Sequence, residues 1–132
     1  MHPMLNIGIR AARNAGKVIV RAIEQLDKVE VQAKGTNDFV TSADLSAEEA
    51  IIETLKKSYP DHTIVGEECG VIKGKDDNFQ WIIDPINGTT NFIKGIPHFS
   101  VSIALKVKGK LDQAIIFDPS RGELFTASRG KG

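Results

Sequence analysis

Cysteine, charge of one sign and long apolar runs are all scarce in this sequence, and each scarcity excludes a class of protein. Cys69 is the only cysteine, which excludes an intramolecular disulfide and a thiolate zinc site and fits a reducing compartment. Seventeen basic residues balance seventeen acidic ones, so no net field attracts nucleic acid or an anionic membrane. Any anion-binding site must therefore depend on a few groups placed close together and not on the net charge of the protein.

Apolar segments are short. None approaches the roughly eighteen residues of a membrane span, and the N-terminal residues lack the basic start, apolar run and small-residue cleavage site of a signal peptide. We therefore expect a cytoplasmic protein with no membrane partner. A chain of 132 residues suits one ordinary domain with its own core, and it contains no internal repeat or low-complexity tract.

Small and apolar residues recur at three- and four-residue steps from Met4 to about Leu26. This pattern predicts an amphipathic helix that packs on a sheet or on another helix. The stripe lacks large aromatic anchors, which argues against a helix at a membrane surface. The residues expected on its buried side are Leu5, Gly8, Ala12, Ala15, Ile19, Ala22 and Leu26.

A second helix is expected to begin between Thr41 and Ser46 and to end at Pro60. Thr41 with Asp44, and Ser46 with Glu49, have the spacing of a capping box or a near variant of it. From spacing alone, Asp44 is most simply a first-turn carboxylate that the helix dipole stabilises, with no catalytic role. The residues expected to be buried are Ala47, Ala50, Ile51, Leu55 and Tyr59.

Two short strands end at acidic residues. Residues 63–65 form one, which is followed by Gly66, Glu67 and Glu68, and residues 81–83 form the other, which leads to Asp84. Adjacent acids at a strand end are usually just a solvated turn. If the two strands are neighbours in a sheet, however, their ends bring carboxylates together in an arrangement that binds hard cations.

The other segments are simpler to interpret. Residues 29–32 are expected to be extended and residues 34–38 to form a turn, while the polar, aperiodic residues 71–78 are expected to be a mobile loop. Residues 99–108 alternate between apolar and polar, which predicts a strand. With a hairpin turn at 109–110 and further strands at 111–117 and 123–128, they make an antiparallel meander. The order of elements indicates an α+β or layered α/β fold.

The segment that follows residue 83 carries the most chemistry. Hydroxyl and amide groups suit a phosphate, and a carboxylate, a main-chain carbonyl and an amide oxygen on one turn suit magnesium. A plain Asx turn explains the same residues equally well. The segment is neither a Walker loop nor a dinucleotide-binding loop. Its residues are Asp84, Pro85, Ile86, Asn87, Gly88, Thr89, Thr90 and Asn91.

This segment resembles the Asp-Pro-x-Asp-Gly-Thr-x-Asn signature of the inositol monophosphatase family of magnesium-dependent, lithium-sensitive sugar phosphatases. Residues 34–44, 66–68, 81–84, 97–104 and 123–127 also look like that family, in the right order, so the resemblance covers nearly the whole chain. It is strongest to bacterial members. The resemblance implies a layered α-β-α-β-α sandwich of the sugar phosphatase type, of which residues 1–132 are the N-terminal part of a single domain.

The resemblance also implies a metal site with two or three Mg²⁺ ions. Glu67, Asp84, the Ile86 carbonyl and Asn87 correspond to the family's ligands, and Asp84 bridges two ions. Asp44 is implied to be a catalytic partner, together with Glu67. In the family, one metal lowers the pKa of the attacking water and the other stabilises the leaving oxygen.

The loop residues take their implied roles from the same comparison. Thr89, hydrogen-bonded to Asp44, positions the attacking water. Gly88, Thr89 and Thr90 bind the phosphate, and Glu67 and Asn87 complete the substrate site. Lys34 and the loop after it form a mobile segment that closes near the metals.

Two departures from the family pattern bear on activity. Asn87 stands where the family has a second aspartate, so we expect weaker binding of the second metal and slower catalysis. Deamidation at the Asn87-Gly88 sequence would restore an aspartate in part of a sample. The family chain is also about twice as long, and its later half supplies another aspartate and the residues that recognise the inositol ring.

The leading hypothesis is hydrolysis of inositol monophosphate or a related sugar monophosphate, impaired here by Asn87 and by the missing half. The alternative is a catalytically weakened protein that acts through protein contacts in transcription and ribosomal RNA synthesis. A phosphatase of fructose bisphosphate or adenosine bisphosphate is a third possibility. We expect a homodimer in the complete protein.

Overall fold

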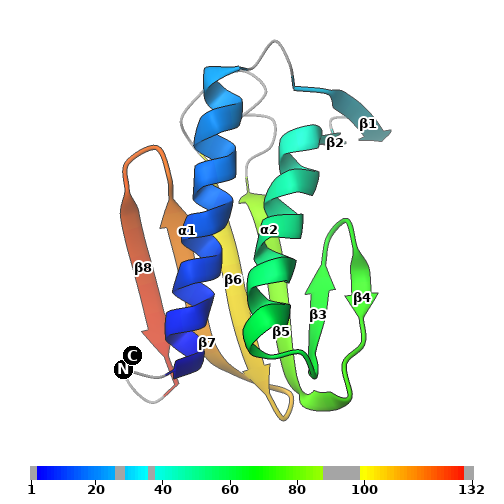
Figure 1. Cartoon of the computed structure of the whole chain (residues 1–132), viewed down its shortest axis with the longest axis vertical. Coiled ribbons are helices and arrows are strands. Elements are labelled where there is room, and N and C mark those ends of the chain that lie inside the picture. Colours follow the sequence, from blue (N-terminus) through cyan, green and yellow to red (C-terminus); the bar gives the residue numbers. More distant parts are fainter. Residues whose placement is uncertain (1–2, 26–28, 36–37, 88–98, 130–132) are drawn as a thin grey trace.

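The computed structural model describes residues 3–25, 29–35, 38–87 and 99–129, without the side chains of residues 34, 35, 38–40 and 87. Two helices lie side by side over one face of a six-stranded sheet, and a small hairpin stands at one end (Figure 1). Along the chain the elements are α1 (Pro3–Glu24), β1 (Val31–Gly35), β2 (Asp38–Thr41), α2 (Ser42–Ser58), β3 (His62–Gly66), β4 (Gly70–Ile72), β5 (Asp76–Asn87), β6 (Ser100–Val107), β7 (Lys110–Asp118) and β8 (Glu123–Ser128).

The large sheet has the strand order β4-β3-β5-β6-β7-β8. Only the β3–β5 pair is parallel, and every other neighbouring pair is antiparallel. The predicted α+β class and the three-stranded meander are therefore confirmed. None of the described helices is long and apolar enough to cross a membrane.

The amphipathic stripe of α1 packs on the sheet as predicted. Two glycines in this stripe allow the close approach, because a side chain at Gly8 would collide with Ile115 and one at Gly16 with Phe117. Leu26 lies outside the described residues, and Ala22 is only half-buried. The buried residues of α1 are Leu5, Gly8, Ala11, Ala12, Ala15, Gly16 and Ile19.

Helix α2 begins with the predicted capping box. The Thr41 hydroxyl accepts a hydrogen bond from the Asp44 amide at 3.1 Å, and the Asp44 carboxylate accepts one from the Thr41 amide at 2.8 Å. Such reciprocal bonds satisfy two backbone donors that a helix start otherwise leaves unpaired. Ala50 and Tyr59, which were predicted to be buried, are half-buried. The buried face includes Glu48 instead, whose role the periodicity did not reveal.

The predicted mobile loop at residues 71–78 is wrong. Strand β4 covers residues 70–72, and β5 begins at residue 76, well before the predicted start at Trp81. The Thr63 hydroxyl holds this polar segment, because it accepts a hydrogen bond from the Gly74 amide at 3.0 Å and donates one to Asp77 at 3.0 Å. Polar composition therefore marked an exposed strand edge here and not a loop.

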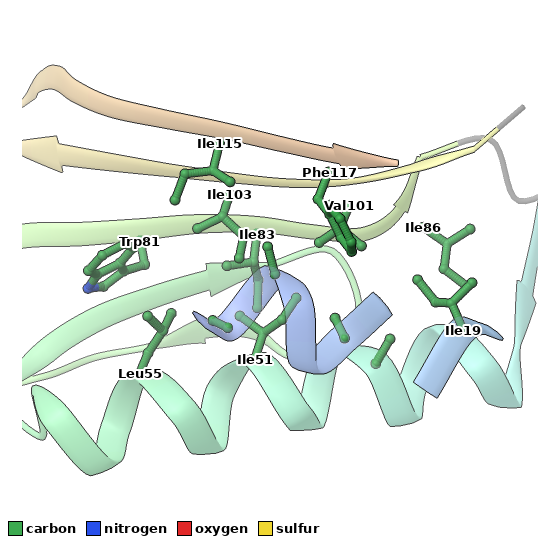
Figure 2. Close-up of a cluster of buried hydrophobic side chains, with 14 of the residues drawn as sticks. Ile19, Ile51, Leu55, Trp81, Ile83, Ile86, Val101, Ile103, Ile115 and Phe117 are labelled. Carbon is green, nitrogen blue, oxygen red and sulfur yellow. The ribbon is translucent and has the colours of Figure 1, made fainter. Parts of the chain in front are cut away.

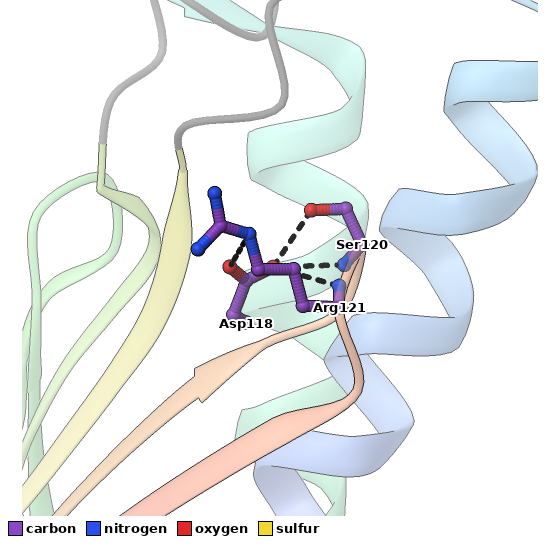
Figure 3. Close-up of polar contacts among 3 residues, drawn as sticks. All are labelled: Asp118, Ser120 and Arg121. Carbon is purple, nitrogen blue, oxygen red and sulfur yellow. Dashed lines mark hydrogen bonds and ion pairs between the residues drawn. The ribbon is translucent and has the colours of Figure 1, made fainter.

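The turns of the meander lie close to their predicted places. Lys108 and Gly109 have φ values of 52° and 79°, the positive pair that a two-residue hairpin turn requires, so β7 begins at Lys110. The turn between β7 and β8 is held by one carboxylate oxygen of Asp118 (Figure 3). This oxygen accepts hydrogen bonds from the Ser120 amide at 2.9 Å, the Ser120 hydroxyl at 2.7 Å and the Arg121 amide at 3.1 Å.

The small hairpin differs from the prediction by a few residues. Strand β1 begins at Val31, not at residue 29, and runs to Gly35, through part of the predicted turn. It pairs with β2, whose last residue is Thr41, the N-cap of α2.

The core fills the space between the two helices and the sheet (Figure 2). Ile51 and Leu55 of α2 point towards the sheet, and Trp81 of β5 is fully buried. Full burial of an aliphatic or aromatic side chain of this size contributes about 1.5–3 kcal/mol. The other labelled residues of this cluster are Ile19, Ile83, Ile86, Val101, Ile103, Ile115 and Phe117.

Candidate metal centre

The parallel pairing of β3 and β5 brings Glu67 and Asp84 together. Glu67 directly follows β3, as predicted, whereas Asp84 lies inside β5, which runs on to Asn87 and does not end at residue 83. In their register Gly66 lies opposite Ile83, so Glu67 and Asp84 are the next residues along the two neighbouring segments. The two strands share a direction, and their carboxyl ends therefore meet. This confirms the predicted condition for a cation site, that the two strands be neighbours.

One carboxylate oxygen of Asp84 has no hydrogen-bond partner among the described residues. This oxygen, Oδ1, is buried. Burial, and then repulsion from the carboxylates of Glu67, Asp44 and Glu48, raise the pKa of Asp84 to about 6, while a backbone hydrogen bond from Ile86 acts in the opposite direction. A cation beside this carboxylate would remove both the burial cost and the repulsion.

Asp44 is buried at the start of α2, and its structural role is visible. Its Oδ2 atom accepts hydrogen bonds from the Thr41 amide at 2.8 Å and the Thr41 hydroxyl at 2.6 Å. The interpretation as a helix-start carboxylate is therefore confirmed. Its charge also acts on Asp84, which is compatible with a place beside the centre. The predicted bond from Thr89 involves a residue outside the described part of the chain.

Glu67 and Ile86 are placed by their strands. Glu67 follows β3 on the turn to β4 and is exposed, and its carboxylate acts on Asp84. Ile86 is buried near the end of β5, with a side chain in the core. Asn87 ends β5 opposite Ser100, and its side chain is not described. Its predicted role as a metal ligand stays a prediction.

The structure describes only some of the remaining predicted site residues. Gly88, Thr89 and Thr90 lie outside the described residues, so their predicted contacts with phosphate stay predictions. The backbone of Lys34 lies in β1 and not in a loop, because the hairpin with β2 extends to Gly35. The predicted closure of this segment over the metals also stays a prediction.

The described side chains do not complete a metal site by themselves. Within residues 3–25, 29–35, 38–87 and 99–129, no three Asp, Glu, His or Cys side chains come close enough to bind one ion. The donors that fit an ion here are the carboxylates of Asp84 and Glu67, joined by oxygens outside that set, the Ile86 carbonyl and the Asn87 amide. All are oxygen donors, the kind that Mg²⁺ prefers.

Glu48 is a functional candidate that the sequence analysis missed. It lies one turn after Asp44 on α2, with 3% of its surface exposed, and binds the turn that carries Glu67. Its position among Ala47 and Ile51, on the apolar side of the helix, was the available signal, because a carboxylate in such a position needs a partner.

Comparison with known proteins agrees with this geometry. The profile described as "Inositol monophosphatase family" matches residues 1–132. The "Nus factor SuhB" of Pasteurella multocida is 59% identical over 132 residues, which are 100% of this chain and 49% of that protein. The chain thus spans about half the length of the curated relatives it matches.

Two solved structures have the same fold. The extragenic suppressor protein SuhB from Bartonella henselae superposes with a TM-score of 0.97 at 41% identity, over 99% of this chain and 51% of that one. The inositol monophosphatase of Thermotoga maritima superposes with a TM-score of 0.88 at 32% identity, over 99% of this chain and 50% of that one. The match over all 132 residues shows that the chain belongs to the inositol monophosphatase family and is of its SuhB type.

Proposed function

We propose that the protein hydrolyses the phosphate monoester of inositol or of a related sugar in a Mg²⁺-dependent reaction. The observation that carries the proposal is the Asp84 carboxylate beside Glu67, because its Oδ1 atom is buried and accepts no hydrogen bond from the described residues. Perturbed carboxylates clustered at strand ends are typical of functional sites. Membership of the family supports the same reaction class.

In this proposal the chain's own residues hold the ions and orient the reactants. Asp84, Glu67, the Ile86 carbonyl and Asn87 would hold Mg²⁺. When bound, Mg²⁺ supplies positive charge that activates water and stabilises the leaving oxygen. Asp44 has a conformation fixed by its two hydrogen bonds to Thr41, so it can hold a hydroxyl partner in one place.

The loop after β5 provides the remaining groups. The Thr89 hydroxyl is proposed to donate a hydrogen bond to Asp44 and to accept one from the attacking water, and Gly88 and Thr90 are proposed to donate to the phosphate. Lys34 and the residues after it are proposed to close the site. Asn87 contributes an oxygen without charge, so the second of two or three Mg²⁺ sites binds weakly.

The activity is proposed for a protein of the relatives' length, because this chain spans about half of it. Residues 1–132 are then one part of a single domain. A further carboxylate and the groups that recognise the sugar are expected from the other part. The 132 residues alone are expected to turn over little.

The test is phosphate release from inositol monophosphate by the protein at the full length its gene encodes. We expect a rate that depends on Mg²⁺, falls at least a hundredfold in Asp84→Asn, and rises in Asn87→Asp, since removal of metal-site groups has effects of about this size. Glu53→Gln, an exposed change on α2, is the control. Undiminished hydrolysis by Asp84→Asn, or in the presence of a chelator, would overturn the proposal.

A second candidate is a protein that acts through contacts with the transcription machinery. Two observations favour it: the relative from Pasteurella multocida is described as a Nus factor, and Asn87 replaces a carboxylate in the site. The decisive comparison is binding of wild type and Asp84→Asn to purified transcription complexes. Equal binding by a variant that has lost hydrolysis supports this second role, and absence of binding by wild type contradicts it.

The finer parts of the proposal need separate measurements. Fructose bisphosphate and adenosine bisphosphate are the alternative substrates, and a comparison of kcat/KM across the three substrates decides among them. Inhibition by Li⁺, a homodimeric assembly and a cytoplasmic location complete the proposal. An inhibitor titration, light scattering and cell fractionation test these in turn.

A further inference from the structure

Glu48 is a buried carboxylate with a specific target. It lies on α2 one turn after Asp44, on the side that faces the sheet. A carboxylate loses much hydration free energy on burial unless strong hydrogen bonds replace the water. Glu48 therefore needs partners, and the partners that it has lie twenty residues further along the chain.

Those partners are two backbone amides of the turn between β3 and β4. The Oε1 atom of Glu48 accepts a hydrogen bond from the Cys69 amide at 2.7 Å, and the Oε2 atom accepts one from the Glu68 amide at 3.2 Å. Bonds from an amide to a charged carboxylate are about twice as strong as bonds between neutral groups. One side chain thus ties two successive residues of the turn to a rigid helix.

Gly66 leaves the room that this contact needs. A Cβ atom at Gly66 would lie 2.5 Å from Glu48 Oε1 and 2.6 Å from Cys69 Sγ, so any larger residue would push the carboxylate away from the turn. The close packing also shows in the Cys69 thiol, because burial and then the Glu48 carboxylate raise its pKa to about 11.

The anchored turn carries Glu67, which lies between Gly66 and the two amides that Glu48 binds. Glu67 is exposed, and the backbone that bears it belongs to the turn that Glu48 holds. We propose that Glu48 is a positioning residue, which holds the Gly66–Gly70 turn so that the Glu67 carboxylate stays beside Asp84 and the two can bind one cation. This inference deepens the proposed function and depends on it for the role of Glu67.

Two variants separate positioning from simple attraction of a cation by negative charge. Glu48→Asp keeps the charge but is one methylene too short to reach both amides. Glu48→Gln loses the charge but keeps an oxygen that can accept from the Cys69 amide. Positioning predicts that Mg²⁺ affinity falls about tenfold in Glu48→Asp and only about threefold in Glu48→Gln. Charge attraction predicts the reverse order, which would overturn the proposal.

Mg²⁺ affinity is read without catalysis, from the rise of the unfolding temperature of the full-length protein with MgCl₂ concentration. Ile115→Val is the matched control, because it removes one methylene from the buried core away from the turn and lowers stability without touching Glu48. It should leave the half-saturating Mg²⁺ concentration unchanged. If the half-saturating Mg²⁺ concentration of Ile115→Val shifted as much as that of Glu48→Asp, lost stability alone would explain the effect. That result would overturn the positioning role of Glu48.

A metal-free measurement keeps this inference distinct from the proposed function. In the presence of a chelator, the Glu68 and Cys69 amides should exchange with solvent at least about tenfold faster in Glu48→Asp than in wild type. Unchanged exchange would overturn the anchoring. If wild type shows this protection but no stabilisation by Mg²⁺, then the proposed metal site fails while the anchoring of the turn stands.

Discussion

Replacement of Asp84 by asparagine should stabilise the metal-free protein at neutral pH, although it removes a proposed ligand. The reason is the pKa of Asp84, which burial and neighbouring carboxylates raise from 3.8 to about 6. A carboxyl group with a raised pKa in the folded state opposes folding wherever it is ionised. Below its unfolded pKa both states are protonated and the cost is absent; it grows as pH rises and is complete above the folded pKa.

The size of the effect follows from the shift. Each pKa unit corresponds to about 1.4 kcal/mol, so a shift from 3.8 to about 6 sets an upper limit of roughly 3 kcal/mol. Asp84 is only half-buried, and solvent screening reduces this limit, which leaves about 1–2 kcal/mol. For a protein of the relatives' length, this corresponds to a rise in unfolding temperature of about 2–8 °C.

The assay is thermal and urea unfolding of the full-length protein with a chelator, at about pH 7.5 and at about pH 4. Asp84→Asn should be more stable than wild type at the higher pH, and most of this difference in stability should vanish at the lower pH. Glu53→Gln controls for a general change in net charge, since Glu53 is exposed on α2. An Asp84→Asn protein less stable than wild type at pH 7.5 would refute the reasoning.

Addition of Mg²⁺ should remove or reverse the stability advantage of Asp84→Asn over wild type. Ligand at a hundredfold excess over its Kd stabilises the folded state by about 2.7 kcal/mol, and only wild type should gain this increment. Wild type should then match or exceed Asp84→Asn at neutral pH. A variant that gains as much from Mg²⁺ as wild type would show that Asp84 is not a ligand.

Three further predictions concern the scaffold. Burial lowers the pKa of His62, whose Nδ1 atom accepts a hydrogen bond from the Trp81 indole at 3.0 Å. The free energy of unfolding should therefore fall as pH drops through 6.5, the pKa of the unfolded state. His62→Asn should flatten this part of the pH profile measured by urea denaturation. Thr41→Val should cost about 1–2 kcal/mol of unfolding free energy through loss of the helix cap, with Thr41→Ser close to wild type in the same assay. Gly74→Ala should lower stability by about 1–3 kcal/mol, because its Cβ would collide with the backbone carbonyl of Asp61; an unchanged urea midpoint would contradict this contact.

Local patterns predicted most of the elements. The stripe of α1, the Thr41 cap of α2 and the alternation along β6 each depend on residues close in sequence, and periodicity records such relations directly. The error at residues 71–78 has the opposite cause. Those residues pair with neighbouring strands, and the Thr63 hydroxyl also binds Gly74 and Asp77. No local pattern records these contacts.

The sequence by itself was enough to identify the acidic residues of the centre, to place each of them next to a strand, and to recognise the protein family from the segment that begins at Asp84. These follow from residue type and from spacing along the chain. Tertiary structure alone decided that β3 and β5 are parallel neighbours, so that Glu67 meets Asp84, and that Glu48 reaches across from α2 to the Gly66–Gly70 turn. Strand order and burial are properties of contacts between distant residues, and the pKa of Asp84 depends on both.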